Sequence, residues 1–368
     1  MNHLSKLTIK GFKTIRELKD FKPRSINLLI GENGAGKSNF IGFFRLLSWC
    51  VASVDRFQNF IAEHGFGSAF LFDGPEVTRE IEWHLEIESH TGWNEYAARL
   101  VHGAGDILFF ADEKVRYSKR GRPRNKHWIS LGATHTESRL FEKKNEDRTV
   151  EVIFNLLRKI VVYQFHNTSA KAPIRNAWSI EDGKYLKETG SNLGSFLFYL
   201  FNNYPASYKN ILLHLRTILP FFDDFVLEPE RNSIQLRWRE KYSERIFDAT
   251  QASDGMLRFM ALVALLNQPV ENLPSVMFID EPELGLHPRA LETLAGMFKK
   301  VSRHCQLFIA TQSVSLVDYF EPEDIVVVER QQRHSTFRRL SSQALRTWLE
   351  NYSLSELWEK NVLNIPAP

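Results

Sequence analysis

The segment from Gly31 to Ser38 reads GENGAGKS and combines three glycines with a lysine and a serine. It fits the pattern G-x-x-x-x-G-K-[ST], and it lies between an apolar run, INLLI, and a helical run, NFIGFFRLLSW. Glycines let backbone N–H groups approach an anion closely, and the N-terminal end of the following helix adds positive charge. The segment therefore predicts a phosphate site; the alternative is a glycine-rich turn that merely contains Lys-Ser.

The residue types within this loop predict which part of a nucleotide each side chain would contact. Lys37 would reach the β- and γ-phosphates of a nucleoside triphosphate, and the Ser38 hydroxyl would hold Mg²⁺. We therefore expect ATP and Mg²⁺ as ligands. The residues expected to contact the nucleotide are Gly31, Glu32, Asn33, Gly34, Ala35, Gly36, Lys37, Ser38 and Asn39.

A second segment, SVMFIDEPELGLHP at 275–288, leads an apolar strand directly into two adjacent carboxylates. A buried carboxylate costs several kcal/mol unless it is paired or binds a metal, so these acids need a cation. Asp280 would complete the Mg²⁺ shell, and Glu281 would orient and polarise the attacking water. A surface acid at a strand end is the alternative for Glu281. For Glu283, a solvated loop acid and a functional role fit equally well.

A third segment, QASDGMLRFMALVALL, begins an apolar helix with Ser253, Asp254 and Gly255. The N-terminal end of this helix could bind another phosphate. Ser and Asp are also preferred as ordinary N-caps. The residue types favour neither interpretation.

Composition sets wider limits. The 368 residues are 43% hydrophobic and 25% charged, as in an ordinary soluble globular protein, and the net charge of +3 permits an anionic partner without requiring one. The longest apolar run, 259–266, is far shorter than the roughly 20 residues of a membrane span, and the first residues lack the apolar core of a signal peptide. Two cysteines, one in an apolar run, fit a reducing compartment. We expect a cytoplasmic protein without membrane contact.

The periodicity predicts the elements that position these residues. Short alternating segments from 81 to 131 are typical of an antiparallel meander. From Ser253 onward, helices alternate with strands at 275–280, 305–310 and 324–329, which favours a mostly parallel sheet covered on both faces. Other strands are expected at 7–9, 26–30, 159–165, 225–229, 233–238 and 244–247, and helices at 149–158, 191–201, 207–218 and 289–302. The predicted class is α/β.

Together, these motifs resemble the ABC-type ATPase heads of the SMC, RecF and OLD kind, close to the stand-alone AAA-family ATPases of the AAA15 and AAA21 type. LTIKGFKTI resembles their N-terminal strand pair, GENGAGKS their Walker A, FIDEPELGLHP their Walker B with the D-loop, and SDGMLR lies where they carry the signature. The resemblance covers residues 1–48 and about 245–330. It implies a P-loop NTPase fold with a mostly parallel core sheet, an N-terminal antiparallel β subdomain and a helical lobe.

The resemblance also implies boundaries within a single head. A Walker A lobe with the meander would span 1–165, and a helical and strand lobe 166–250. The signature, Walker B and switch would lie in 251–340, followed by C-terminal helices in 341–368.

Further roles follow from the resemblance alone. Two heads would sandwich ATP as a homodimer or a higher even oligomer, with Ser253 and Gly255 acting in trans and His287 near the seam. Asp254 and Met256 depart from the transporter signature LSGGQ. Gln312 stands where related ATPases carry a switch histidine; its amide can hydrogen-bond phosphate or water but carries no charge, which predicts modest turnover.

Gln164 has a Q-loop position from which it could contact Mg²⁺ or the attacking water. His166 is a competing candidate for that role. A purely structural role for both residues is the alternative.

The biological role is inferred by analogy. The chain lacks the heptads of an SMC arm, and fewer than 40 residues follow the last expected strand, too few for the nuclease domain of OLD proteins. The pattern resembles the ATPase subunits of bacterial defence systems, Septu-type and retron-associated, which work with a partner such as an HNH nuclease. We predict a nucleotide-gated ATPase that controls a nucleic-acid transaction or an effector, in anti-phage defence or DNA repair. The alternative is a regulatory scaffold that binds ATP, hydrolyses it slowly and holds partner proteins without contacting nucleic acid.

A basic stretch, YSKRGRPRNKHW at 117–128, lies between two expected strands and ends in Trp128, which could stack on a base. Its cations, at a predicted hairpin tip, are Lys119, Arg120, Arg122, Arg124 and Lys126. They could follow the phosphates of DNA or RNA, or they could form a solvated loop. Residues 331–339, QQRHSTFRR, form a weaker second basic patch.

Overall fold

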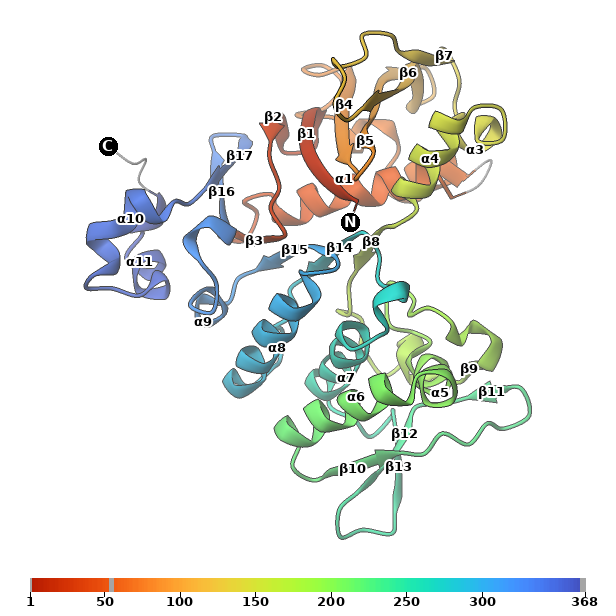
Figure 1. The fold of residues 1–368 in the computed structure, drawn as a ribbon, viewed down its shortest axis with the longest axis vertical. Coiled ribbons are helices and arrows are strands. Elements are labelled where there is room, and N and C mark those ends of the chain that lie inside the picture. Colours follow the sequence, from red (N-terminus) through yellow and green to blue (C-terminus); the bar gives the residue numbers. More distant parts are fainter. Residues whose placement is uncertain (1, 53–55, 365–368) are drawn as a thin grey trace.

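The computed structural model describes residues 2–52 and 56–364 (Figure 1). Its central sheet has the order β17-β16-β3-β15-β14-β8, and all neighbours are parallel except the β16–β17 hairpin. The strands are β3 (Ile26–Ile30), β8 (Ile160–Tyr163), β14 (Val276–Asp280), β15 (Gln306–Thr311), β16 (Ile325–Gln331) and β17 (His334–Arg339). Because β3, β14 and β15 are buried throughout, their sequences are nearly continuous apolar runs.

The second sheet is antiparallel, with the order β2-β1-β4-β5-β6-β7. Along β4, burial alternates residue by residue, so one face packs inward and the other meets solvent. The strands are β1 (His3–Phe12), β2 (Ile15–Phe21), β4 (Glu80–Glu88), β5 (Gly92–Gly103), β6 (Ile107–Lys119) and β7 (Ile129–Gly132).

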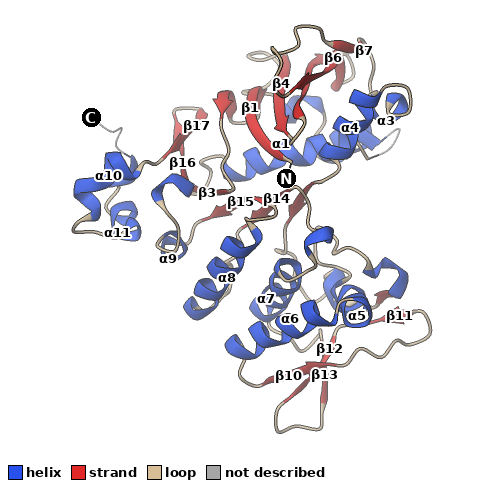
Figure 2. Cartoon of the chain, in the orientation of Figure 1, coloured by secondary structure: helices blue, strands red, loops and turns tan. Residues whose placement is uncertain are grey.

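Helix α1 (Lys37–Cys50) lies between the two sheets (Figure 2). Phe43 packs edge-on against Trp83 of β4, with ring centroids 5.9 Å apart, whereas Phe44 stacks on Phe278 of β14 at 4.1 Å. Aromatic pairs of this kind contribute about 0.5–1.5 kcal/mol beyond their area burial. Both sheets therefore hold the middle of α1, the helix that follows the glycine-rich loop.

Helices cover the opposite face of the central sheet and form a separate lobe (Figure 2). Those of the covering layer and the lobe are α5 (Leu193–Asn203), α6 (Pro205–Ile218), α7 (Asp254–Leu266), α8 (Pro288–Val301) and α9 (Val314–Val317). Small sheets beside them contain β9 (Trp178–Ser179), β10 (Phe222–Phe225), β11 (Ser233–Ile234), β12 (Arg237–Glu240) and β13 (Ile246–Asp248).

The remaining helices lie at the periphery. They are α2 (Arg56–Glu63), α3 (Leu140–Lys143), α4 (Arg148–Leu157), α10 (Ser342–Leu349) and α11 (Leu354–Glu359). Short 3-10 helices are η1 (Gly67–Phe70), η2 (Pro173–Arg175), η3 (Ile180–Gly183), η4 (Val270–Asn272), η5 (Pro322–Asp324) and η6 (Val362–Asn364). Within residues 2–52 and 56–364, no helix combines the length and apolar character needed to cross a membrane.

The predicted α/β class, mostly parallel core sheet, antiparallel β subdomain and helical lobe are confirmed. The strand expected at 225–229 is wrong, because β10 ends at Phe225. The strand expected at 233–238 is two strands, since β11 pairs with β9 whereas β12 pairs with β10 and β13. Residues 365–368 of the expected C-terminal helical segment lie outside the described residues.

Candidate nucleotide-binding and catalytic site

The glycine-rich loop joins β3 to α1 and encloses the Lys37 side chain, which is only 5% exposed. Lys37 Nζ donates to the carbonyl oxygens of Gly31 at 2.6 Å and Glu32 at 3.1 Å. Burial lowers the pKa of Lys37, and the negative charges of Glu281 and Asp280 oppose this shift. The Lys37 ammonium and the two acids, more than 240 residues apart in the sequence, therefore influence one another electrostatically.

The β16–β17 hairpin packs directly against this loop. A Cβ atom added to Gly31 would lie 2.1 Å from the carbonyl oxygen of Val328, and one added to Gly36 would lie 2.0 Å from Ser335 Oγ. Ser335 Oγ donates to the carbonyl oxygen of Ala35 at 2.6 Å and lies 2.7 Å from Thr14 Oγ1. Glycine is therefore required at both positions by close contact as well as by positive φ.

Asp280 lies at the carboxyl end of β14 and is 6% exposed. Burial, reinforced by Glu281, raises its pKa. Its Oδ1 atom is buried and has no hydrogen-bond partner among the described residues. An unpartnered buried carboxylate oxygen is costly, and it fits a hard cation such as Mg²⁺.

The rest of such an ion's shell must come from elsewhere. The described part of the chain contains no group of three or more His, Cys, Asp or Glu side chains that could hold a metal alone. Mg²⁺ commonly uses one or two carboxylates together with waters and substrate phosphates. Ser38, which is exposed at the start of α1, could supply a further oxygen. The donor set therefore fits Mg²⁺ bound together with a triphosphate.

Glu281 follows Asp280 with a φ of 46°, a backbone conformation uncommon outside glycine, and its N–H donates to the carbonyl oxygen of Ala310 at 2.8 Å. The Gln312 side-chain amide donates to Glu281 Oε1. Lys37, Ser38, Glu281 and Gln312 line one cavity of about 210 Å³ at the carboxyl ends of the strands. The structure thus brings together side chains that are more than 240 residues apart in the sequence.

Glu283 has a supporting position. Its Oε1 accepts from the backbone N–H groups of Gln312 at 2.8 Å and Ser313 at 3.2 Å. This carboxylate holds the loop that carries Gln312, which resolves the alternative left by the sequence in favour of a specific contact.

Gln164 connects Asp280 to the helix that follows the phosphate loop. Its Nε2 donates to Asp280 Oδ2 at 3.4 Å and to His166 Nδ1 at 2.9 Å, and its Oε1 accepts from Arg45 of α1. Because His166 Nδ1 accepts, its Nε2 carries the proton and donates to the carbonyl oxygen of Asp280 at 3.0 Å. Sequence reasoning missed Arg45; the signal was a lone cation within an apolar helical run.

Ser253 caps α7: its Oγ accepts from the N–H of Met256 at 3.2 Å. Asp254 forms an ion pair at 2.9 Å with Arg175, which is buried. A Cβ added to Gly255 would lie 2.2 Å from the carbonyl oxygen of Gly285, so the signature and D-loop pack backbone to backbone. Neither Ser253 nor Gly255 lines the 210 Å³ cavity of their own chain.

The Met256 side chain is buried, so it is not presented on the surface beside Ser253. Two residues further along α7, Arg258 donates to the carbonyl oxygens of Phe165, His166 and Leu284. Sequence reasoning missed this residue as well. It holds the Gln164 loop, the D-loop and the signature helix in one arrangement.

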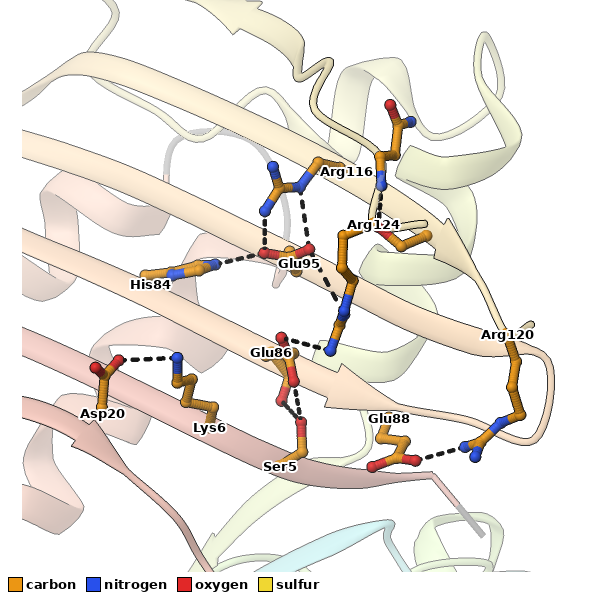
Figure 3. Close-up of polar contacts among 12 residues, drawn as sticks. Ser5, Lys6, Asp20, His84, Glu86, Glu88, Glu95, Arg116, Arg120 and Arg124 are labelled. Carbon is orange, nitrogen blue, oxygen red and sulfur yellow. Dashed lines mark hydrogen bonds and ion pairs between the residues drawn. The ribbon is translucent and has the colours of Figure 1, made fainter. Parts of the chain in front are cut away.

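The basic stretch runs from the end of β6 to the start of β7 and folds back onto the sheet (Figure 3). Arg120 pairs with Glu88, and Arg124 pairs with Glu86 at 3.2 Å. The Arg116 guanidinium lies 4.3 Å from the ring centroid of Trp128. Two of the five predicted cations and the predicted stacking residue are therefore already engaged within the chain.

The remaining three cations, Lys119, Arg122 and Lys126, are exposed and form no ion pair within the described part of the chain. The weaker patch at 331–339 forms most of the β16–β17 hairpin. Its arginines Arg338 and Arg339 donate to the carbonyl oxygens of Leu363 and Glu323, so they serve the fold.

Comparison with known proteins places the chain in a family. The sequence profile described as "AAA domain, putative AbiEii toxin, Type IV TA system" matches residues 26–318, which include both motifs of the site. A search of curated proteins found no match.

Solved structures with a similar fold include the Smc head domain with an extended coiled coil, bound to the C-terminal domain of ScpA, from Pyrococcus furiosus. Its TM-score is 0.61 at 12% identity, covering 95% of this chain and 99% of that one. A second Smc head, bound to the C-terminal winged-helix domain of ScpA, has a TM-score of 0.61 at 14% identity, covering 94% and 99%. At these identities the likeness concerns the fold. The chain belongs to this AAA-domain family of P-loop ATPases and has the fold of an SMC-type head.

Proposed function

We propose that this protein binds ATP with Mg²⁺ and hydrolyses it to ADP and phosphate. The observation that carries the proposal is the convergence of Lys37, Glu281 and Gln312 on one cavity, beside the buried and unpartnered Oδ1 of Asp280. Phosphoryl transfer depends mainly on positioning and charge neutralisation, and this arrangement offers both.

Each side chain has a distinct part in the proposed reaction. Lys37, now bonded to two carbonyl oxygens of its own loop, would exchange them for phosphate oxygens. Bound Mg²⁺, held by Asp280 and Ser38 with Gln164 nearby, would neutralise phosphate charge. Glu281 would accept a proton from the attacking water while Gln312 holds its carboxylate in place.

We propose further that ATP holds two copies together, with Ser253 and Gly255 of one copy meeting the triphosphate of the other. Two observations support this. Ser253 is exposed at the N-terminal end of α7, and neither residue faces the cavity of its own chain. In this proposal the dimer, in the cytoplasm, controls an effector such as an HNH nuclease in anti-phage defence, or a DNA-repair step. The toxin named in the family description, and the ScpA partner of the similar Smc heads, are consistent with a protein partner.

A regulatory scaffold remains the second candidate, and Gln312 is the observation that favours it. Gln312 stands where a charged histidine could assist the departing phosphate, and it is bonded to Glu281 instead. Such a site would bind ATP well and turn it over slowly.

Lys37→Ala tests the proposal, with Lys10→Ala on the solvent side of the β subdomain as control. Loss of charge-assisted bonds to two phosphate groups should weaken ATP·Mg²⁺ binding at least about 100-fold, measured by calorimetry. Equal binding by Lys37→Ala and the unaltered protein would contradict the assignment. If the unaltered protein binds ATP but releases phosphate no faster than Lys37→Ala, the scaffold is the better description.

Contact with DNA or RNA is proposed only through Lys119, Arg122 and Lys126, because Arg120 and Arg124 are already paired with glutamates. Fluorescence anisotropy of a labelled oligonucleotide should show binding that weakens steeply as salt rises. Absence of binding even at low salt would leave the protein partner as the sole target.

A further inference from the structure

The cavity at the phosphate loop is too small for a whole nucleotide. Its volume is about 210 Å³, whereas pockets that enclose drug-sized ligands range from about 300 to 1,000 Å³. The side chains that face it, a lysine, a serine, two carboxylates and amides, suit phosphates and a cation. The nucleoside half of a bound triphosphate must therefore lie outside it.

A second cavity of about 430 Å³ adjoins the first. Both are lined by Glu32, Asn33 and Gly34 of the phosphate loop and by Arg330 at the end of β16. Trp358 of α11 and Gln332 in the β16–β17 turn also line the second cavity. A molecule with its phosphates in the first cavity could extend around the loop into the second.

The lining of this second cavity suits a nucleoside. Trp358 is half-buried, and no aromatic ring or cation of the described residues stacks on its indole. Arg330 is exposed and forms no ion pair within the described part of the chain, so its guanidinium is available to a phosphate or a ribose oxygen. Glu329 can accept from ribose hydroxyls, and the Gln332 amide can both donate to and accept from a base edge.

Contacts within the chain also position the residues that line the second cavity before any ligand binds. Ser335 and Val328 fix the hairpin against the loop at Ala35 and Gly31, so Arg330 and Gln332 are presented at a set distance from the phosphate site. At the other wall, a capping box of Ser353 and Glu356 starts α11. A preformed pocket loses little entropy when its ligand binds.

The turn between β1 and β2 is the competing place for a base, because Thr14 also lines the phosphate cavity. The aromatic residue that precedes it, Phe12 at the end of β1, is fully buried and packs edge-on against Phe43. Lys13 of the same turn lies over the ring of Phe70, 5.1 Å from its centroid. That turn therefore offers no aromatic surface for stacking.

We propose that the nucleoside half of the triphosphate binds in the 430 Å³ cavity, with its base on the indole of Trp358 and Arg330 at the junction with the phosphates. This inference rests on the proposed nucleotide binding. It makes the C-terminal helices part of the ligand site and gives them a means to sense whether a nucleoside is present.

The test compares two probes, ATP and inorganic tripolyphosphate, each with Mg²⁺, on the full chain by calorimetry. Stacking on an aromatic ring contributes about 1–3 kcal/mol per base, so Trp358→Ala should weaken ATP binding about 5- to 150-fold and leave tripolyphosphate binding unchanged. Trp358→Phe should keep most of the affinity. Trp348→Ala is the matched control, because this tryptophan of α10 is 46% exposed and lies outside the cavity.

The outcomes separate this inference from the proposed function. Equal loss of ATP and tripolyphosphate in Trp358→Ala, or no loss of either, would overturn the nucleoside site while nucleotide binding stands. An unaltered protein that binds neither probe would overturn both.

Photolabelling of the unaltered chain with 8-azido-ATP gives an answer that does not depend on how the variants fold. The label should appear on residues 329–332 or on Trp358. Label confined to Lys13 and Thr14 would place the base at the other turn and refute the inference.

Discussion

Replacing Glu281 with glutamine changes charge at the site while keeping shape. A glutamine oxygen can still accept from the Gln312 amide, and the backbone N–H of residue 281 still donates to Ala310. What disappears is the ability to take a proton from water. A positioned general base contributes about 10²- to 10⁴-fold, so the barrier should rise by about 2.7–5.4 kcal/mol and kcat should fall by that factor.

The affinity of Glu281→Gln for ATP·Mg²⁺ should not fall with its turnover. Burial raises the pKa of Asp280, and the neighbouring charge of Glu281 raises it further. Without that charge, the pKa of Asp280 shifts downward, in the direction of the ionised form that a magnesium ion requires. ATP·Mg²⁺ affinity in Glu281→Gln should therefore be equal to or tighter than that of the unaltered protein, and the dimer should accumulate.

The assay pairs phosphate release with calorimetry and light scattering on the same preparations. Glu283→Gln is the control, because a neutral oxygen there can still accept from Gln312 and Ser313, and turnover should change less than about tenfold. The reasoning fails if Glu281→Gln keeps more than a tenth of its turnover, or if it loses ATP binding together with activity.

Two further predictions concern the signature and the β subdomain. Ser253→Ala removes the N-cap of α7 and should lower the free energy of unfolding in urea by about 1 kcal/mol. Asp147→Ala, at the N-cap of α4, is the control and should cost a similar amount. If Ser253 acts in trans, only Ser253→Ala should also lower ATP turnover. Burial pushes the pKa of Glu95 upward, but hydrogen bonds from His84 and Arg116 outweigh it and lower this pKa from 4.5 to about 2. The stability that Glu95 contributes is therefore present above pH 4.5 and lost as pH falls towards 2, and Glu95→Gln should lack this part of the acid dependence of the urea midpoint. An unchanged acid profile in Glu95→Gln would show that the cluster in Figure 3 adds no pH-dependent stability.

The sequence predicted the order of strand, glycine-rich loop and helix correctly because these three elements are contiguous. The eight residues from Gly31 to Ser38 contain the whole motif. The apolar strand that ends in Asp280 and Glu281 is equally short, and its two acids predict a nearby cation. The alternation of helices and strands after Ser253 predicted the parallel sheet correctly, because each of these elements is also a contiguous segment. The polar strand β17 and the short strands of the small sheets gave weak periodic signals, and these are where the expected elements were missed or misplaced.

Only the tertiary structure shows which side chains that are distant in the sequence form hydrogen bonds and ion pairs with one another. No pattern along the chain reveals that Arg45 holds Gln164 beside Asp280, or that Glu86 and Glu88 occupy the arginines of the basic stretch. Each of these contacts depends on how α1, the loop after β8 and the antiparallel sheet pack together. The motifs of the candidate phosphate site could thus be predicted from contiguous residues. The side chains that support this site, the adjoining cavity and the pairing of the basic stretch depend on long-range packing, which brings distant segments into contact without leaving a repeat in the sequence.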